Sequence, residues 1–329
     1  MRRITERLRA GDRLLLDGGT GSELQRRGVD VLLGSTGRLK AWSATANLAA
    51  GDVVRQVHQD YLRVGADIIT SNNFWTGPSR LATLDAGDDW RTYAEAAARN
   101  ALAAREAGNK RAYVAGGIAP PALQDRDSGD LASDVARIGE SAFATEIGDH
   151  ARLLAAAGVD LILLEYLGYV EECAAAVRAC VDIDLPLFVG IRHIGADGSM
   201  QYGESLADLA AELQGQARAP DALLLMCSNP EAIDAGLPIL RDAADGPIGC
   251  YPNLGYNPTG PVANRPVLTN QRPSVSADIL QTADYPPARL AEFARRWLDA
   301  GAQVVGGCCA SGPEHILALR AVVDDAAAS

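Results

Sequence analysis

Three cysteines carry the most distinctive chemistry in the sequence: Cys227, Cys308 and Cys309. Thiolates are ligands that suit zinc, and a catalytic zinc site has three protein ligands and one position for water or substrate. A substrate thiol in that position loses its proton to solvent at neutral pH, because the cation stabilises the thiolate. Three protein thiolates give the centre a net charge of about −1, which favours alkyl transfer to sulfur over hydrolysis.

Other interpretations of these cysteines exist. A cysteine at a strand end is often a small buried hydrophobic residue, and two neighbouring cysteines can be a redox couple. Adjacent side chains alternate across a strand, so Cys308 and Cys309 can face one point only where the backbone bends, and Gly306-Gly307 permits a bend. This run and the third cysteine favour the metal site. Cys173, Cys180 and Cys250 are predicted to be core residues.

Three segments share one pattern, in which a helix ends in a glycine turn and a short apolar run follows: VGADIITS from Val64, AGVDLILLE from Ala157 and AGAQVVGG from Ala300. Glycine is typical of the position after a helix, and the apolar runs are typical of strands in a parallel sheet. The pattern predicts strands at 13–16, 67–70, 112–115, 161–164, 187–191, 222–226, 247–250 and 303–305. The predicted helices are 52–64, 89–107, 138–157, 170–180, 206–214, 230–243, 287–300 and 313–323.

Eight such units predict an α/β fold, a single (β/α)8 TIM-type barrel domain over residues 1–329. A doubly wound open sheet uses the same units and is the alternative. A long irregular stretch at 253–285, rich in Pro, Asn and Gly, follows the seventh strand. Loops of this length are usually functional or disordered.

Charge and hydropathy exclude several classes of protein. The net charge is −12 and Lys and Arg do not cluster, so nucleic acid is not an expected partner. The charged start lacks the apolar core of a secretory signal, and no stretch of about 18 apolar residues could cross a membrane. We therefore expect a cytoplasmic protein without membrane contact. Its six cysteines are expected to be reduced.

Active-site groups of such barrels follow the carboxyl ends of the strands. Asp17-Gly18-Gly19-Thr20 follows the first predicted strand and Glu165-Tyr166 the fourth. His193 follows the fifth strand, where it is either a general base or metal ligand or a solvent-exposed loop residue. The remaining candidates at predicted strand ends are Trp75, Cys227, Asn253, Cys308 and Cys309.

Several motifs together resemble the homocysteine S-methyltransferase family, which includes betaine– and S-methylmethionine–homocysteine methyltransferases. They are DGGTGSEL, LKAWSA, HQDYLRVGADIITSNNF, LLEYLGYVEE, MCSNP, YPN and VVGGCCASGPEHI, spread from Asp17 to His315. The resemblance implies a (β/α)8 barrel with zinc on Cys227, Cys308 and Cys309. It also implies methyl transfer from an onium-type donor to homocysteine, which yields methionine.

The resemblance also implies roles for residues around the metal. Asp17 and Glu165 match positions that bind the homocysteine ammonium, and backbone N–H groups near Gly19 and Thr20 can receive its carboxylate. Alternatively, Asp17 caps the following helix and Glu165 is an ion-paired strand end. Asn253 is expected to belong to the methyl-donor pocket and to orient substrate or a loop.

Trp42, Trp75 and Tyr166 are candidates for the methyl-donor pocket, because aromatic faces attract quaternary ammonium and sulfonium groups. As core residues they would need no functional explanation. The run Asn72–Trp75 departs from the Thr-rich version common in the family, so betaine, S-methylmethionine, S-adenosylmethionine and related sulfonium compounds all remain possible donors.

Three further questions stay open. The acceptor is either homocysteine or a related thiol or selenol. A zinc hydrolase on the same barrel and a non-catalytic zinc- or thiol-binding protein are the alternative functions. The long carboxy-terminal arm that betaine-using members employ for assembly is missing, so we expect a monomer or weak homo-oligomer.

Overall fold

The computed structural model describes residues 2–31, 41–121, 132–195, 197–200, 203–255 and 284–327. In these residues eight parallel strands form one sheet in the order β1-β8-β7-β6-β5-β4-β3-β2. A parallel bridge between Leu16 and Ile68 joins the two outer strands and closes the sheet. The strands are β1 Leu14–Leu15, β2 Ile68–Thr70, β3 Tyr113–Ile118, β4 Leu161–Leu167, β5 Leu187–Arg192, β6 Ala222–Met226, β7 Ile248–Tyr251 and β8 Ala302–Val305. The predicted barrel is confirmed.

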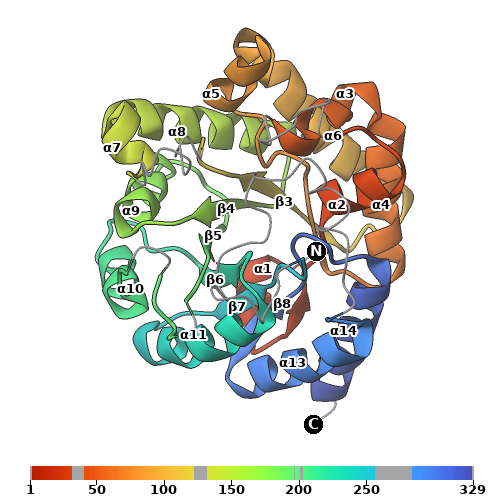
Figure 1. The fold of residues 1–329 in the computed structure, drawn as a ribbon, viewed down its shortest axis with the longest axis vertical. Coiled ribbons are helices and arrows are strands. Elements are labelled where there is room, and N and C mark those ends of the chain that lie inside the picture. The colour runs from red at the N-terminus through yellow and green to blue at the C-terminus, as the bar shows by residue number, and fades with distance from the viewer. Residues whose placement is uncertain are drawn as a thin grey trace.

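Helices surround the strands, as Figure 1 shows. They alternate with the strands because each helix buries one apolar face against the sheet. The helices that follow the strands are α4 Gly51–Arg63, α6 Trp90–Ala107, α8 Glu140–Ala157, α9 Val170–Ala179, α10 Leu206–Gln214, α11 Pro230–Ala243, α13 Pro287–Asp299 and α14 Pro313–Ala327. These agree with the predicted helices to within a few residues.

The short helices are not predicted by the sequence pattern. They are α1 Ile4–Arg9, α2 Thr20–Arg26, α3 Ala46–Ala49, α5 Pro78–Leu81, α7 Asp134–Ile138 and the 3-10 turns Trp42–Thr45, Ala82–Leu84 and Gly87–Asp89. One or two helical turns are too short to produce a clear apolar period.

Strand β4 differs from its prediction in a way that affects function. It continues past Leu164 to Leu167, and its register with β5 shifts between Leu164 and Leu167. Glu165 and Tyr166 therefore lie in a bulge inside the strand. The prediction that they follow its end is wrong. Bulges redirect side chains and are common beside active sites.

Aspartates connect pairs of strands at the amino end of the barrel. The backbone N–H of Asp160 donates to the Val114 carbonyl at 2.8 Å, while its carboxylate accepts the Val114 N–H at 2.7 Å. Asp67 makes the same two contacts with Leu15. Asp221 makes them with Leu187. Each aspartate thus ties the start of an even-numbered strand to the preceding odd-numbered strand.

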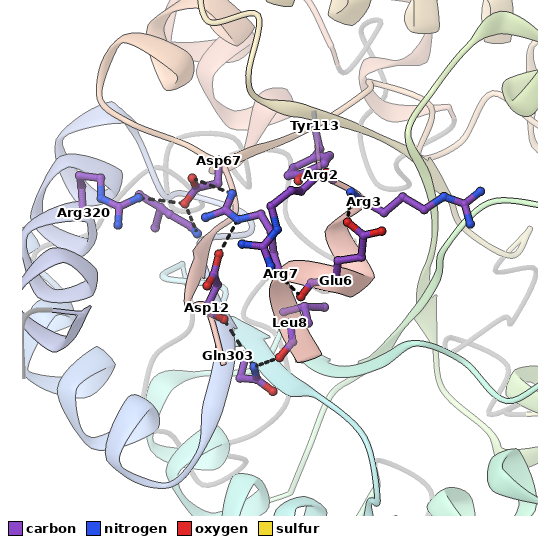
Figure 2. A network of polar contacts seen from close by, with 11 residues as sticks. Arg2, Arg3, Glu6, Arg7, Leu8, Asp12, Asp67, Tyr113, Gln303 and Arg320 are labelled. Atoms are coloured by element: carbon purple, nitrogen blue, oxygen red, sulfur yellow. Dashed lines mark hydrogen bonds and ion pairs between the residues drawn. The ribbon is translucent and has the colours of Figure 1, made fainter. Parts of the chain in front are cut away.

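In β8, Gln303 binds helix α1 and not a neighbouring strand, as Figure 2 shows. Its side-chain amide donates to the Leu8 carbonyl at 2.7 Å, which anchors α1 across the amino end of the barrel. Ile4 and Leu8 of this helix are buried in the same apolar cluster as the inward side chains of the strands. On the same side of α1, Arg7 pairs with Asp12 at 2.8 Å, and the Gln303 amide also donates to the Asp12 carbonyl at 3.4 Å (Figure 2). Helix α1 therefore closes the amino end of the barrel.

None of the helices in the described residues is long and apolar enough to cross a membrane. Most of the long loop predicted at 253–285 lies outside the described residues, which resume at Asp284. The single-domain assignment for residues 1–329 stays a prediction.

Candidate metal and substrate site

The three predicted ligands meet at the carboxyl end of the barrel. The sulfur atoms of Cys227, Cys308 and Cys309 all lie within 4.8 Å of one another, and those of Cys308 and Cys309 are 3.9 Å apart. Four ligands in tetrahedral geometry at about 2.3 Å from zinc would be separated by about 3.8 Å. The cluster therefore fits a zinc ion after small movements. In the described residues it is the one group of three or more Cys, His or acidic side chains close enough to hold a metal.

The sulfur atoms influence one another's ionisation. Hydrogen bonds from Cys308 and Cys309 lower the pKa of Cys227 well below its usual value, and His193 acts in the same direction. Hydrogen bonds with Cys227 and Cys309, together with burial, raise the pKa of Cys308 well above the usual thiol value. The trio is therefore prepared to hold negative charge at Cys227, as a ligand for a soft cation requires.

Three consecutive strands carry a left-handed residue near their carboxyl ends, inside the bulge of β4 and directly after β5 and β6. Tyr166 has φ 63°, His193 has φ 57° and Cys227 has φ 48°. Such conformations are unfavourable for residues other than glycine and gather at functional sites. At Cys227 the turn comes directly after β6 and brings the side chain beside the loop that follows β8.

The remaining cysteines lie away from the metal cluster. Cys173 and Cys180 are fully buried, as predicted. Cys250 is also buried, in the apolar layer between sheet and helices, whereas the neighbouring Tyr251 belongs to the interior cluster of the barrel. Alternation along β7 explains this difference.

Two buried carboxyl groups lie near the sulfur cluster. Burial raises the pKa of Asp17 to about 8. Burial, followed by repulsion from Asp17, raises the pKa of Glu165 to about 8 as well. Asp17 accepts the Thr70 N–H at 2.8 Å, and the N-cap residue of α2 is Gly19, so the alternative role of Asp17 as a helix cap is wrong. Two acids that resist ionisation together are suited to a cationic group between them.

The turn Asp17–Thr20 packs directly on the cysteine segment. The Gly19 N–H donates to the Ser311 carbonyl at 3.0 Å, and a Cβ at Gly19 would lie 2.5 Å from the Cys308 carbonyl oxygen. Glycine is required here by close approach of two backbones. Because the Gly19 N–H already has an acceptor, its expected role as a donor to substrate needs correction. Thr20, at the start of α2, keeps that candidate role.

Two of the three aromatic residues predicted for the donor pocket come together. The rings of Trp75 and Tyr166 are 6.4 Å apart, and Phe74 contacts both at 5.0 and 5.2 Å. Trp42 is buried against α2, where a Cβ at Gly21 would lie 2.1 Å from its Nε1. Phe74 was not among the predicted donor-pocket residues, although it stands in the same run after the second strand.

Two guanidinium groups already stack on these rings. Arg80 lies 3.7 Å from the ring centre of Trp75, and Arg192 lies 4.5 Å from that of Tyr166. Arg192 is fully buried and lowers the pKa of Glu172, whose main shift is upward through burial. A donor cation would therefore share these rings with side chains that carry the same charge.

Asn253 contacts the metal cluster instead of the aromatic group. Its side-chain nitrogen donates to the Cys227 sulfur at 3.5 Å, and its side-chain oxygen accepts the Gly255 N–H at 2.9 Å. These two contacts fix the orientation of the amide.

His193 is buried and lies 5.2 Å from the Tyr166 ring, so the interpretation of His193 as a solvent-exposed loop residue is wrong.

Met226 was missed entirely by sequence reasoning. Its sulfur accepts the Tyr166 N–H at 2.9 Å and lies 3.1 Å from the Tyr251 hydroxyl. The residue reads as one more apolar position of β6, so no signal marks it. Tyr251 occupies space that Gly190 leaves open, since a Cβ there would lie 2.3 Å from its hydroxyl.

A family model described as homocysteine S-methyltransferase matches residues 14–323. The chain belongs to this family. Homocysteine S-methyltransferase 3 of Zea mays is 26% identical over 334 residues, which cover 94% of this chain and 90% of the relative. The family assignment confirms the predicted methyltransferase.

Solved structures of family relatives have the same architecture. The oxidized form of the homocysteine methyltransferase MmuM from Escherichia coli superposes with a TM-score of 0.75 at 25% identity, covering 97% of this chain and 99% of that one. The metallated form gives 0.72 at 25% identity and covers 94% and 96%. A metal-binding form is therefore known for a relative with this fold.

Proposed function

We propose that this family member transfers a methyl group from an onium-type donor to the thiol of homocysteine, with zinc held by Cys227, Cys308 and Cys309. The observation that carries the proposal is the convergence of three sulfur atoms within 4.8 Å at the carboxyl end of the barrel. When bound, zinc supplies a positive charge that keeps the acceptor sulfur ionised at neutral pH. Family membership supports homocysteine as the acceptor.

Asp17 and Glu165 are proposed to bind the ammonium group of the acceptor. Both carboxyl groups are buried, and each has a pKa of about 8 in the protein without substrate. An ammonium between them would favour ionisation of both and lower both pKa values. The backbone N–H of Thr20, at the start of α2, is proposed to donate to the carboxylate of the acceptor. These contacts would hold the acceptor in one orientation, which contributes the usual gain from positioning the reactants.

The donor is proposed to lie against the ring faces of Trp75 and Tyr166 that the guanidinium groups leave open. A good cation–π contact contributes roughly 0.5–2 kcal/mol, and Arg80 and Arg192 reduce the attraction by repulsion. In the proposed direct displacement, the acceptor sulfur forms a bond to the methyl carbon as the bond from that carbon to the donor heteroatom breaks. The electron pair of the broken bond stays on the donor, which becomes neutral.

The decisive experiment combines metal analysis with methyl transfer by a cysteine variant. Purified protein should contain about one zinc per chain and convert homocysteine to methionine with at least one of betaine, S-methylmethionine, S-adenosylmethionine and dimethyl sulfonium compounds. Cys308→Ala should lose zinc and at least about 100-fold in kcat/KM, because a three-ligand site loses one ligand. Cys173→Ala, a buried cysteine of α9, is the matched control and should keep both.

Other outcomes would identify the rival functions. Turnover of a donor without any thiol would indicate a zinc hydrolase. Homocysteine binding without donor consumption would indicate a binding protein. Full methyl transfer by Cys308→Ala, or a fully active protein without zinc, would contradict the proposal.

A further inference from the structure

The loop that follows Cys308 and Cys309 contains a strained residue. We define the cysteine loop as residues 308–312. Within it, Ala310 is fully buried and has φ 64°, a left-handed conformation that costs roughly 1–2 kcal/mol for a residue with a Cβ. This bend directly follows Cys308 and Cys309, whose sulfur atoms both lie within 4.8 Å of that of Cys227. Some other contact must hold the bend in place.

Helix α2 supplies that contact through two side chains one turn apart. The Ser22 hydroxyl oxygen accepts the Ala310 N–H at 2.8 Å, and the Arg26 guanidinium donates to the Ala310 carbonyl at 2.7 Å. Ser22 is buried, and Arg26 is oriented by an ion pair with Glu23. Both backbone polar groups of Ala310 are therefore bound by one helix.

The same helix begins at the turn proposed to bind the acceptor. Thr20 is the first residue of α2, and the Gly307 N–H donates to the Asp17 carbonyl at 2.9 Å. The Tyr61 hydroxyl of α4 donates to the Ser311 carbonyl at 3.0 Å, the same carbonyl that accepts the Gly19 N–H. The cysteine loop is thus held against α2 and the Asp17 turn, with Ala310 at the centre of the contact.

We infer that Ser22 and Arg26 are positioning residues that keep the three sulfur atoms convergent by clamping Ala310 in its left-handed conformation. The inference rests on the metal site of the proposed function. Without the clamp, Ala310 relaxes toward an ordinary conformation and turns Cys308 and Cys309 away from Cys227. Metal retention then falls, although no ligand has been removed.

The test compares two arginines of the same helix. Arg26→Gln removes the donor to Ala310. Arg27→Gln is the matched control, because Arg27 pairs with Glu23 and Asp60 on the helix surface. Zinc-loaded proteins are mixed with excess chelator and zinc release is followed. Arg26→Gln and Ser22→Ala should release zinc about 10-fold faster than the parent protein, the range seen when groups supporting metal ligands are removed, and Arg27→Gln should not.

A rescue variant separates the clamp from a general loss of stability. Glycine adopts φ 64° without the penalty of a Cβ. Ala310→Gly combined with Arg26→Gln should therefore restore at least half of the lost zinc retention. Equal release rates for Arg26→Gln and Arg27→Gln, or no rescue by Ala310→Gly, would overturn the inference.

A readout without zinc distinguishes failure of this inference from failure of the proposed function. Phenylarsine oxide binds only where two thiols converge. In metal-free protein, Arg26→Gln and Ser22→Ala should react with it several-fold more slowly than the parent, and Ala310→Gly should again restore the rate. If the parent protein binds no zinc but this pattern holds, the metal proposal fails while the clamp stands. If all variants react alike, the clamp is wrong.

Discussion

The two ends of the barrel solve the same backbone problem with different residues. At the amino end, Gly65, Gly158 and Gly301 take the left-handed conformation between a helix and the next strand, with φ between 94° and 98°. At the carboxyl end, Gly198 and Gly203 of the loop after β5 also have positive φ, but four residues with side chains do so too: Tyr166, His193, Cys227 and Ala310. Glycine suffices where only the path of the chain matters. Strain is accepted at the other end, where three of these side chains face the proposed site.

Acidic residues differ between the two ends in the same way. Asp160 and Glu165 belong to one chain segment, just before and within β4. Asp160 pairs with Arg105 at 2.6 Å and accepts a backbone N–H, so its charge is compensated. Glu165 is buried beside another acid, and its pKa is raised to about 8. One carboxylate stabilises the barrel, whereas the other is held in an unfavourable environment that a cationic substrate would relieve.

The largest expected effect comes from Glu165→Gln. If Glu165 binds the acceptor ammonium, removing its charge should cost about 3–5 kcal/mol of binding in the transition state, or at least about 100-fold in kcat/KM for homocysteine. The thermal midpoint should not fall. Steady-state kinetics and thermal unfolding of the same preparation measure both. A variant that keeps full kcat/KM would remove Glu165 from the proposed site.

Asp160→Asn should produce the opposite pattern. The amide cannot ion-pair with Arg105, and its oxygen is a weaker acceptor for the Val114 N–H, so we expect a loss of about 1–3 kcal/mol of unfolding free energy. KM for homocysteine should stay unchanged below the unfolding temperature. Chemical denaturation and kinetics at 20–25 °C test this. A change in KM without a change in stability would contradict the division between the two ends.

Stability of the metal-free protein should depend on pH through Glu165. Its pKa is about 8 in the folded state and near 4.5 in the unfolded state. Between these values the folded protein holds a proton that the unfolded chain releases, so the unfolding free energy falls as pH rises. The contribution has a slope of up to about 1.4 kcal/mol per pH unit, which Glu165→Gln should remove. Denaturation of parent and variant from pH 5 to 7.5 measures the difference, and parallel curves would disprove it.

The smallest expected effect concerns a glycine of the amino end. Gly158 has φ 95° and ψ 28°, and a Cβ there would meet no atom within 4 Å. Gly158→Ala therefore adds backbone strain without a clash and should cost about 1 kcal/mol of unfolding free energy. Ala310→Gly at the carboxyl end should raise the unfolding free energy by a similar amount. Thermal denaturation of both variants measures whether each change lowers or raises stability. If both changes act in the same direction, backbone strain does not distinguish these two positions.

Much of this architecture was predictable from the sequence. Repeated helix-glycine-strand segments gave strands close to β2, β4 and β8, because apolar runs and glycine turns are local signals. Cys308 and Cys309 could be grouped with Cys227 because all three follow strand ends, and strand ends of a barrel share one face. Helix α1 was not predicted, because its two buried apolar residues, Ile4 and Leu8, do not form a recognisable period and pack only against the barrel interior.

The sequence by itself determined the fold class, the family and the three cysteines whose sulfur atoms converge, because periodicity, glycine turns and strand-end residues are properties of the chain order. Only the tertiary structure decided that Glu165 lies in a bulge, that Asn253 contacts Cys227, and that Arg26 reaches Ala310. These contacts join residues that no sequence period relates. They depend on the angle at which separate strands and helices pack, which is set by the whole core.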